Sequence, residues 1–126
     1  MKHTIAFSDA HIHDDELVDH VEALCKYVES RRPQLLVLVG DIADPWQKKW
    51  TDILQTKSWD RLCRLCAARD ADGLKTVYIR GNHDNGVKKK HLRGNSHHGT
   101  KTAPMKKLTI KWRHREGGFL FIHGWQ

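Results

Sequence analysis

Long apolar runs are missing from this 126-residue sequence. None approaches the ~18–20 residues that a membrane-spanning helix needs. Residues 5–7 are too few for the hydrophobic region of a secretory signal. We therefore expect a soluble, cytoplasmic protein without a transmembrane segment.

Cysteine is scarce as well, with only Cys25, Cys63 and Cys66 in the sequence. An odd count without a secretory signal excludes a disulfide-stapled scaffold and indicates reduced thiols. Cys63 and Cys66 have the spacing of a metal or redox pair, but no second pair accompanies them and residues 61–66 follow a helical pattern. We expect these thiols to pack in the core.

Hydrophobic residues are also few, at 39% of the chain, which indicates a thin or incomplete core. The length of 126 residues allows one domain at most, over residues 1–126. The 22 basic and 15 acidic residues leave a net charge of +7, which favours anionic partners such as phosphates or nucleic acid. Residues 86–115 contain no acidic residue and ten lysines and arginines. We expect this stretch to be mostly loop, serving either as a solvated surface or to steer anions.

The apolar residues that are present predict an α/β fold. Runs at 4–8, 35–39 and 76–79 are typical of buried strands, and residues 108–112 and 119–122 read as further strands. Helical patterns separate the first three strands. Such a β-α-β-α-β order predicts a mainly parallel sheet with helices on its faces.

Helices are expected over 16–31, from Pro45 and again from Ser58. Acidic residues precede the first two helices as caps: Asp14, Asp15 and Asp44. For Asp44 a role beyond capping stays equally open. Trp46 and Trp50 fall on the apolar stripe of the second helix, and we expect them to pack in the core rather than stack on a ligand.

Four short motifs place oxygen and imidazole groups where strands end. They are Asp9-Ala10-His11, Gly40-Asp41-Ile42-Ala43-Asp44, Gly81-Asn82-His83-Asp84 and His123-Gly124. Because parallel strands bring their C-terminal ends to one edge of the sheet, these groups should converge there. Carboxylate, amide and imidazole groups together suit manganese, iron or zinc. A carboxylate such as Asp41 can bridge two metals ~3.5–4 Å apart, the arrangement used for in-line attack on phosphorus.

The four motifs in this order resemble the calcineurin-like metallophosphoesterase family, from residue 8 to residue 124. The resemblance implies an α/β/β/α sandwich that hydrolyses a phosphate monoester, diester or pyrophosphate. It implies two divalent transition metals as cofactors, manganese first and iron or zinc as alternatives. A phosphorylated substrate is the implied partner.

The same resemblance assigns roles to seven residues. Five are metal ligands: Asp9 and His11 at the first metal, Asn82 and His123 at the second, and Asp41 between the two. His83 would be the general acid over the substrate phosphate, paired with Asp84. Trp46 and the His123-Gly124 pair also resemble the branch that contains the UDP-diacylglucosamine pyrophosphohydrolases.

One departure from the family is the absence of its final Gly-His-x-His motif, which would give one imidazole to each metal. His97-His98-Gly99 cannot replace it because it precedes His123. We therefore expect a sandwich truncated at its C-terminus, with weakened metal binding, impaired activity and an exposed edge beside residues 119–122.

Two other functions compete with this interpretation. His11-Ile12-His13 after the first strand resembles the His-x-His of amidohydrolase-like and histidinol-phosphatase-like barrels, but those folds need more βα units and do not explain Gly81-Asn82-His83-Asp84. The second alternative is a catalytically incomplete basic domain that binds nucleic acid or another anionic partner.

Overall fold

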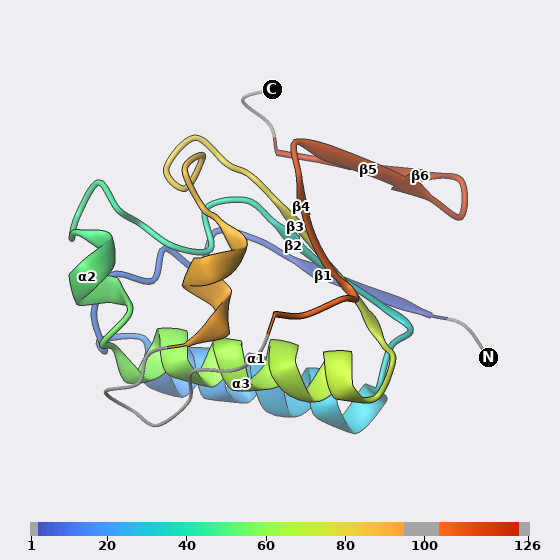
Figure 1. The fold of residues 1–126 in the computed structure, drawn as a ribbon, viewed down its shortest axis with the longest axis horizontal. Helices are drawn as coiled ribbons and strands as arrows, with labels where there is room; N and C mark the ends of the chain where they lie inside the picture. The colour runs from blue at the N-terminus through green and yellow to red at the C-terminus, as the bar shows by residue number, and fades with distance from the viewer. Residues whose placement is uncertain (1–2, 95–103, 124–126) are drawn as a thin grey trace.

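A four-stranded parallel sheet forms the centre of the computed structural model, which describes residues 3–94 and 104–123 (Figure 1). The strands in spatial order are β1 (Thr4–Phe7), β2 (Leu35–Val39), β3 (Lys75–Ile79) and β4 (Leu108–Lys111). Every neighbouring pair is parallel. The aliphatic runs of β2 and β3 are buried almost throughout because both faces of the sheet are covered. The predicted α/β fold with a parallel sheet is confirmed.

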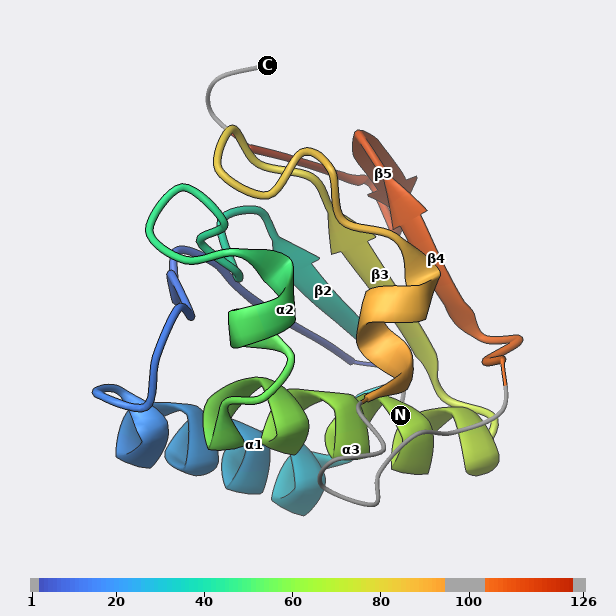
Figure 2. The same cartoon turned by 60° about the vertical axis from the view of Figure 1, so that its left-hand side comes forward.

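Two long helices, α1 (Val18–Arg31) and α3 (Lys57–Ala71), lie side by side against one face of the sheet (Figures 1 and 2). Leu36, Leu38 and Tyr78 point from the sheet into the apolar core that these helices close. Two shorter helical segments, α2 (Trp50–Ile53) and the 3-10 helix η1 (Lys89–Arg93), pack around the same core.

An antiparallel hairpin covers part of the other face. It consists of β5 (Arg113–Glu116) and β6 (Phe119–Ile122), joined by Gly117-Gly118. Both glycines have positive φ, at 59° and 82°, as a two-residue turn of this kind requires. Phe121 packs against a small second core from β2 and β3: Leu35, Val37, Val77 and Ile79. Within residues 3–94 and 104–123 no helical layer lies beyond this hairpin, so the fourth layer of the expected α/β/β/α sandwich is not seen.

The helix caps differ from the prediction. α1 begins at Val18 without a side-chain cap. Asp15 instead accepts hydrogen bonds from the backbone N–H of Lys57 (2.7 Å) and Ser58 (3.2 Å) at the start of α3. It thereby adds to the cap of α3 by Thr56, whose Oγ1 accepts from the Trp59 amide (3.1 Å). Asp14 caps no helix: it accepts from the Glu16 amide in a local turn, and its Oδ2 lies 3.4 Å from His13 Nε2.

The helix expected from Pro45 is also wrong. Residues 44–47 form a turn, in which the Gln47 amide donates to the Asp44 carbonyl (3.0 Å), and α2 begins only at Trp50. Proline favours the second position of such a turn. Asp44 is therefore not a helix cap.

All three cysteines are buried and free, with Cys25 on α1 and Cys63 and Cys66 on α3, and the Cys63 thiol donates to the His91 carbonyl (3.6 Å). Burial raises the pKa of Cys25 and of Cys66 to about 12. Thiols of this kind are unreactive, so the prediction that they pack in the core is confirmed.

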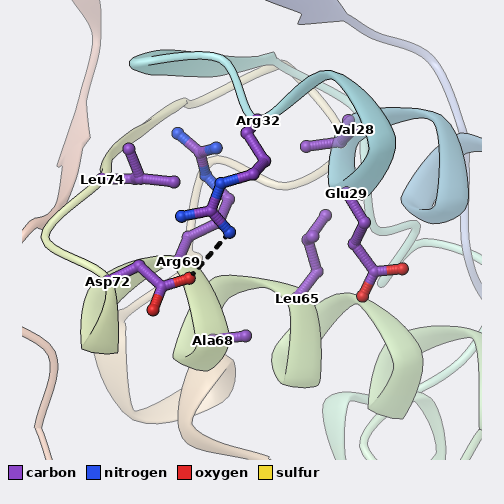
Figure 3. Close-up of a pocket in the computed structure, with 8 residues that line it drawn as sticks. All are labelled: Val28, Glu29, Arg32, Leu65, Ala68, Arg69, Asp72 and Leu74. Carbon is purple, nitrogen blue, oxygen red and sulfur yellow. Dashed lines mark hydrogen bonds and ion pairs between the residues drawn. The ribbon is translucent and has the colours of Figure 1, made fainter.

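A cavity of about 260 Å³ lies between the C-terminal parts of α1 and α3 (Figure 3). Its lining residues are Val28, Glu29, Arg32, Leu65, Ala68, Arg69, Asp72 and Leu74. Arg69 donates to the Pro33 carbonyl (2.9 Å) and to Thr76 Oγ1 (3.0 Å), which ties together the beginnings of β2 and β3. The cavity therefore lies at the opposite end of the strands from the four motifs, and its buried arginine has a structural role.

A search for membrane-spanning helices over residues 3–94 and 104–123 finds no candidate, since the helices there lack the necessary length and apolar character.

Candidate metal centre

The loops that follow β1, β2 and β3 meet at the C-terminal edge of the sheet. Two backbone hydrogen bonds join the first loop to the second: Asp9 N–H to the Gly40 carbonyl (3.1 Å) and His11 N–H to the Asp41 carbonyl (2.9 Å). Asp9, His11 and Asp41 all have positive φ, at 60°, 49° and 53°. This left-handed backbone is uncommon outside glycine and is concentrated at functional sites.

One group of ligand atoms brings together Asp9, Asp41 and His123, all within 4.8 Å of one another. His123 Nε2 lies 3.3 Å from Asp41 Oδ2 and 3.5 Å from Asp9 Oδ1. His123 reaches this group from the end of β6, because the hairpin folds back over the sheet. Gly40 leaves room for it, since a Cβ there would come within 2.5 Å of His123 Cδ2.

A second group consists of His11, Asp41 and His83, again with ligand atoms within 4.8 Å. Asp41 belongs to both groups, as the bridging role inferred from the family resemblance requires. The division of the other ligands differs from that expectation. His11 groups with His83, although its Nε2 also lies 3.7 Å from Asp9 Oδ1.

Asn82 faces the carboxylate of Asp41. One terminal atom of its amide lies 2.8 Å from Asp41 Oδ2 and 3.2 Å from Oδ1. With its nitrogen in that place the amide donates two hydrogen bonds to Asp41. If that atom is instead the amide oxygen, it faces both carboxylate oxygens of Asp41, and the three oxygens need a cation between them. The donor set of carboxylate, amide oxygen and imidazole therefore fits divalent transition metals.

Asp41 itself is buried and held from two sides. Its Oδ1 accepts a hydrogen bond from the His83 amide (2.8 Å), and its Oδ2 faces His123. Gly81 is needed for this packing, because a Cβ there would lie 2.3 Å from Asp41 Oδ1 and 2.5 Å from the Asp41 nitrogen. The glycine that begins Gly81-Asn82-His83-Asp84 thus permits the close approach of two loops.

His83 is oriented by Asp44, which sequence reasoning left as either a cap or a functional residue. His83 Nδ1 lies 2.9 Å from Asp44 Oδ1, and His11 Nδ1 lies 3.4 Å from Asp44 Oδ2. The hydrogen bond to Asp44 raises the pKa of His83 against the opposing effect of burial. Burial alone would raise the pKa of Asp44, but the hydrogen bond and charge of His83, followed by those of His11, hold it below its ordinary value.

Asp84 does not contact His83 in the way that the resemblance implied. Its fully buried carboxylate accepts from four backbone amides and one hydroxyl: Asp41 N (3.1 Å), Ile42 N (2.9 Å), Ala43 N (3.2 Å), Gly81 N (2.8 Å) and Tyr78 Oη. The partner of the His83 ring is therefore Asp44, because the oxygens of Asp84 are already used to hold the second loop. Burial, followed by the neighbouring Asp84, raises the pKa of Tyr78.

Trp46 is a further correction. It was expected in the core, but it is 66% exposed and its indole stacks on the His83 imidazole, with ring centroids 3.9 Å apart. Trp50 does pack inside, against His91 and Trp59. The Asp-Pro pair before Trp46 is a turn signal that could have revealed the difference.

A third group, His13, Asp14 and Glu16, shares no residue with the other two, although His13 Nδ1 lies 2.8 Å from the His11 carbonyl oxygen. Gly124, the last residue of the fourth motif, and His97-His98-Gly99 lie outside the described residues.

Comparisons with known proteins show the family and a similar fold. The family model for calcineurin-like phosphoesterases matches residues 2–126. The fold is similar to the crystal structure of Pseudomonas putida nuclease MPE, with a TM-score of 0.55 and 16% sequence identity over 90% of this chain. The match spans 50% of the nuclease chain. No curated protein sequence matches. Since the family model covers nearly all of the sequence, the chain belongs to the calcineurin-like phosphoesterase family.

Proposed function

We propose that the chain is part of a metal-dependent phosphoesterase that works through two cations sharing Asp41. The observation that carries this proposal is the position of Asp41 in both groups of ligand atoms, beside Asp9 and His123 in one and beside His11 in the other. His83, which also lies in the second group, is kept for the proton transfer described below. Asn82 presents its amide to the same carboxylate. A shared carboxylate reduces the repulsion between two neighbouring cations, so Asp41 is the residue on which the centre depends.

Asp9, His11, Asp41, Asn82 and His123 would hold the cations, as the family resemblance implies. When bound, two divalent cations stabilise charge on the phosphoryl oxygens and acidify a water nucleophile. Manganese is the first choice, with iron or zinc as alternatives, because the donor set mixes hard oxygen and borderline imidazole ligands.

We assign His83 as the general acid for the leaving oxygen. The ring is fixed at Nδ1 by Asp44, which leaves Nε2 to carry the proton that is transferred. The hydrogen bond between Nδ1 and the Asp44 carboxylate stabilises the protonated ring that a general acid needs. Asp44, which neighbours both His83 and His11, is then a positioning residue.

For the substrate, we favour nucleic acid over the other phosphoesters that the family resemblance allows. The chain carries a net charge of +7, and its structural neighbour is a nuclease. The resemblance to UDP-diacylglucosamine pyrophosphohydrolases rests only on Trp46 and His123-Gly124. A lipid-linked pyrophosphate is accordingly the weaker choice.

Elemental analysis of purified variants tests the metal assignment. Asp41→Asn keeps the size of the side chain and tolerates a left-handed backbone, but it removes the shared charge. We expect it to lose most of the manganese that the wild-type chain retains after dialysis. Asp14→Ala, which alters the exposed third group, should retain wild-type metal. Equal metal content in the two variants would refute the assignment.

The alternative function, a basic domain that binds an anionic partner without hydrolysis, predicts a different result. Binding of an oligonucleotide would then be unaffected by chelation and would weaken steeply with salt. Manganese-dependent release of product from bis-p-nitrophenyl phosphate, lost in Asp41→Asn, would exclude this alternative.

A further inference from the structure

An exposed tryptophan lies directly on the candidate general acid. The Trp46 indole stacks on the His83 imidazole at 3.9 Å with an angle of 24° between the planes, yet Trp46 is 66% exposed. Stacking covers only one face of an indole. The other face is therefore open to solvent beside the metal ligands, where a flat group attached to a bound phosphate could lie.

The turn over residues 44–47 fixes this indole in place. The Gln47 amide donates to the Asp44 carbonyl (3.0 Å), and Pro45 restricts the backbone between them. The Asp44 side chain of the same turn holds the His83 ring at 2.9 Å. One short segment thus positions both the indole and the imidazole beneath it, so the open face is presented in a defined orientation.

Exposed lysines occur in the sequence shortly after both partners of this stack, Trp46 and His83. Lys48 and Lys49 follow Trp46 and are exposed, and a run of three exposed lysines follows the His83 loop: Lys88, Lys89 and Lys90. A flat aromatic surface next to cationic side chains is the combination that binds single-stranded nucleic acid, because bases stack on the ring while phosphates meet the charges.

We propose that Trp46 is a stacking platform for an unpaired base of single-stranded nucleic acid whose adjoining phosphate lies at the metal ligands. This inference rests on the proposed function only in placing the phosphate. A base within a duplex is already stacked on its neighbours and cannot lie on the indole. The platform therefore selects single strands and frayed ends over intact duplex.

Binding of two oligomers with identical phosphates tests the proposal. One is a fluorescently labelled oligothymidylate, and the other is the same length with every base replaced by hydrogen. Fluorescence anisotropy is measured on the full chain at low temperature, with manganese and separately with chelator, and the oligomer is checked for integrity afterwards. We expect the wild type to bind the thymidylate more tightly, and Trp46→Ala to weaken that binding about 5- to 150-fold.

The same substitution should change binding of the abasic oligomer less than about twofold, since stacking needs a base. Trp46→Phe should recover part of the loss. Tyr27→Ala, at an exposed aromatic residue on α1, is the matched control and should bind like the wild type. Equal affinity of the wild type for both oligomers, an equal loss for both in Trp46→Ala, or no binding of thymidylate would each overturn the proposal. Base-dependent binding without any hydrolysis would contradict the proposed function and leave the platform standing.

Discussion

We assigned His83 as the residue that protonates the leaving oxygen of the phosphoester. His83→Asn should lower turnover of alkyl phosphodiesters about 10²- to 10⁴-fold, the usual contribution of a positioned acid. The loss should be much smaller for a nitrophenolate leaving group, which barely needs protonation. Steady-state rates with a series of leaving groups provide the measurement, and metal content shows that the site is still loaded. A loss independent of the leaving group's pKa would contradict the general-acid role.

Glycine is needed at position 81 because a larger side chain would clash with Asp41, and not because the backbone there is left-handed. A methyl group there would lie 2.5 Å from the backbone nitrogen of Asp41, which cannot move without displacing the second loop. We expect Gly81→Ala to lower the free energy of unfolding by about 1–3 kcal/mol and to reduce metal content. Urea titration measures the first effect. Gly86→Ala, with no atom within 4 Å of the added carbon, is the matched control. Equal stability of the two variants would show that the loops separate freely.

At the scale of elements, η1 contains a histidine that couples folding to pH. His91 is buried, and burial, followed by the charges of Lys90 and Lys88, lowers its pKa from 6.5 to about 4. Its Nδ1 accepts a hydrogen bond from the Lys88 amide (3.0 Å), and a proton on Nδ1 would break that bond. The neutral ring also stacks on Trp50 at 4.1 Å.

The sign of the pH effect follows from these two pKa values. Between pH 6.5 and about 4 the unfolded chain binds a proton that folded His91 excludes, so stability falls as pH decreases through this window. The contribution is at most about 3 kcal/mol. His91→Gln should flatten the curve of unfolding free energy against pH in this range, as measured by urea titration at several pH values. Parallel curves for wild type and His91→Gln would refute the coupling.

Most elements could be predicted from the sequence because their hydrophobic periods are clear. β1, β2, β3 and α1 follow apolar patterns that the structure reproduces within a few residues. β5 was not predicted, because its residues 113–116 are charged and its pairing with β6 is set by the Gly117-Gly118 turn. The contact of Asp15 with the start of α3 could not be predicted either, since the Lys57 and Ser58 amides lie some forty positions further along the chain.

The convergence of the candidate ligands at one edge of the sheet could be predicted, but the contacts among them could not. Strand ends identified Asp9, Asp41 and His123 as neighbours, because parallel strands share an edge and β6 returns to it. The partnership of His83 with Asp44 depends on a turn, and side-chain direction within a turn is not visible in hydrophobic spacing. The roles of these residues remain predictions for the experiments above.

For the whole molecule, the hairpin on the second face leaves apolar surface uncovered. Phe119, Leu120 and Ile122 are all exposed, and within the described residues β6 pairs only with β5. A free strand edge with apolar side chains favours association with other chains. We expect the 126-residue chain to associate at raised concentration, as measured by sedimentation velocity.

Charge on that strand should suppress the association. The double variant Leu120→Lys, Ile122→Lys should shift the sedimentation coefficient towards that of a monomer. Leu17→Lys adds charge at an equally exposed leucine near the start of α1 and should have no such effect. Association unchanged in the double variant would place the contact elsewhere.

The left-handed backbone at Asp9, His11 and Asp41 has an evolutionary consequence. Each such conformation costs a residue other than glycine about 1–2 kcal/mol, so the chain holds these side chains in place against its own tendency to relax. Glycine at position 9 would relieve part of that strain while deleting a candidate ligand. Homologues that no longer need to hydrolyse a phosphoester would therefore gain stability by replacing Asp9, His11 and Asp41. In such homologues these strand-end residues would be lost before the residues of the hydrophobic core.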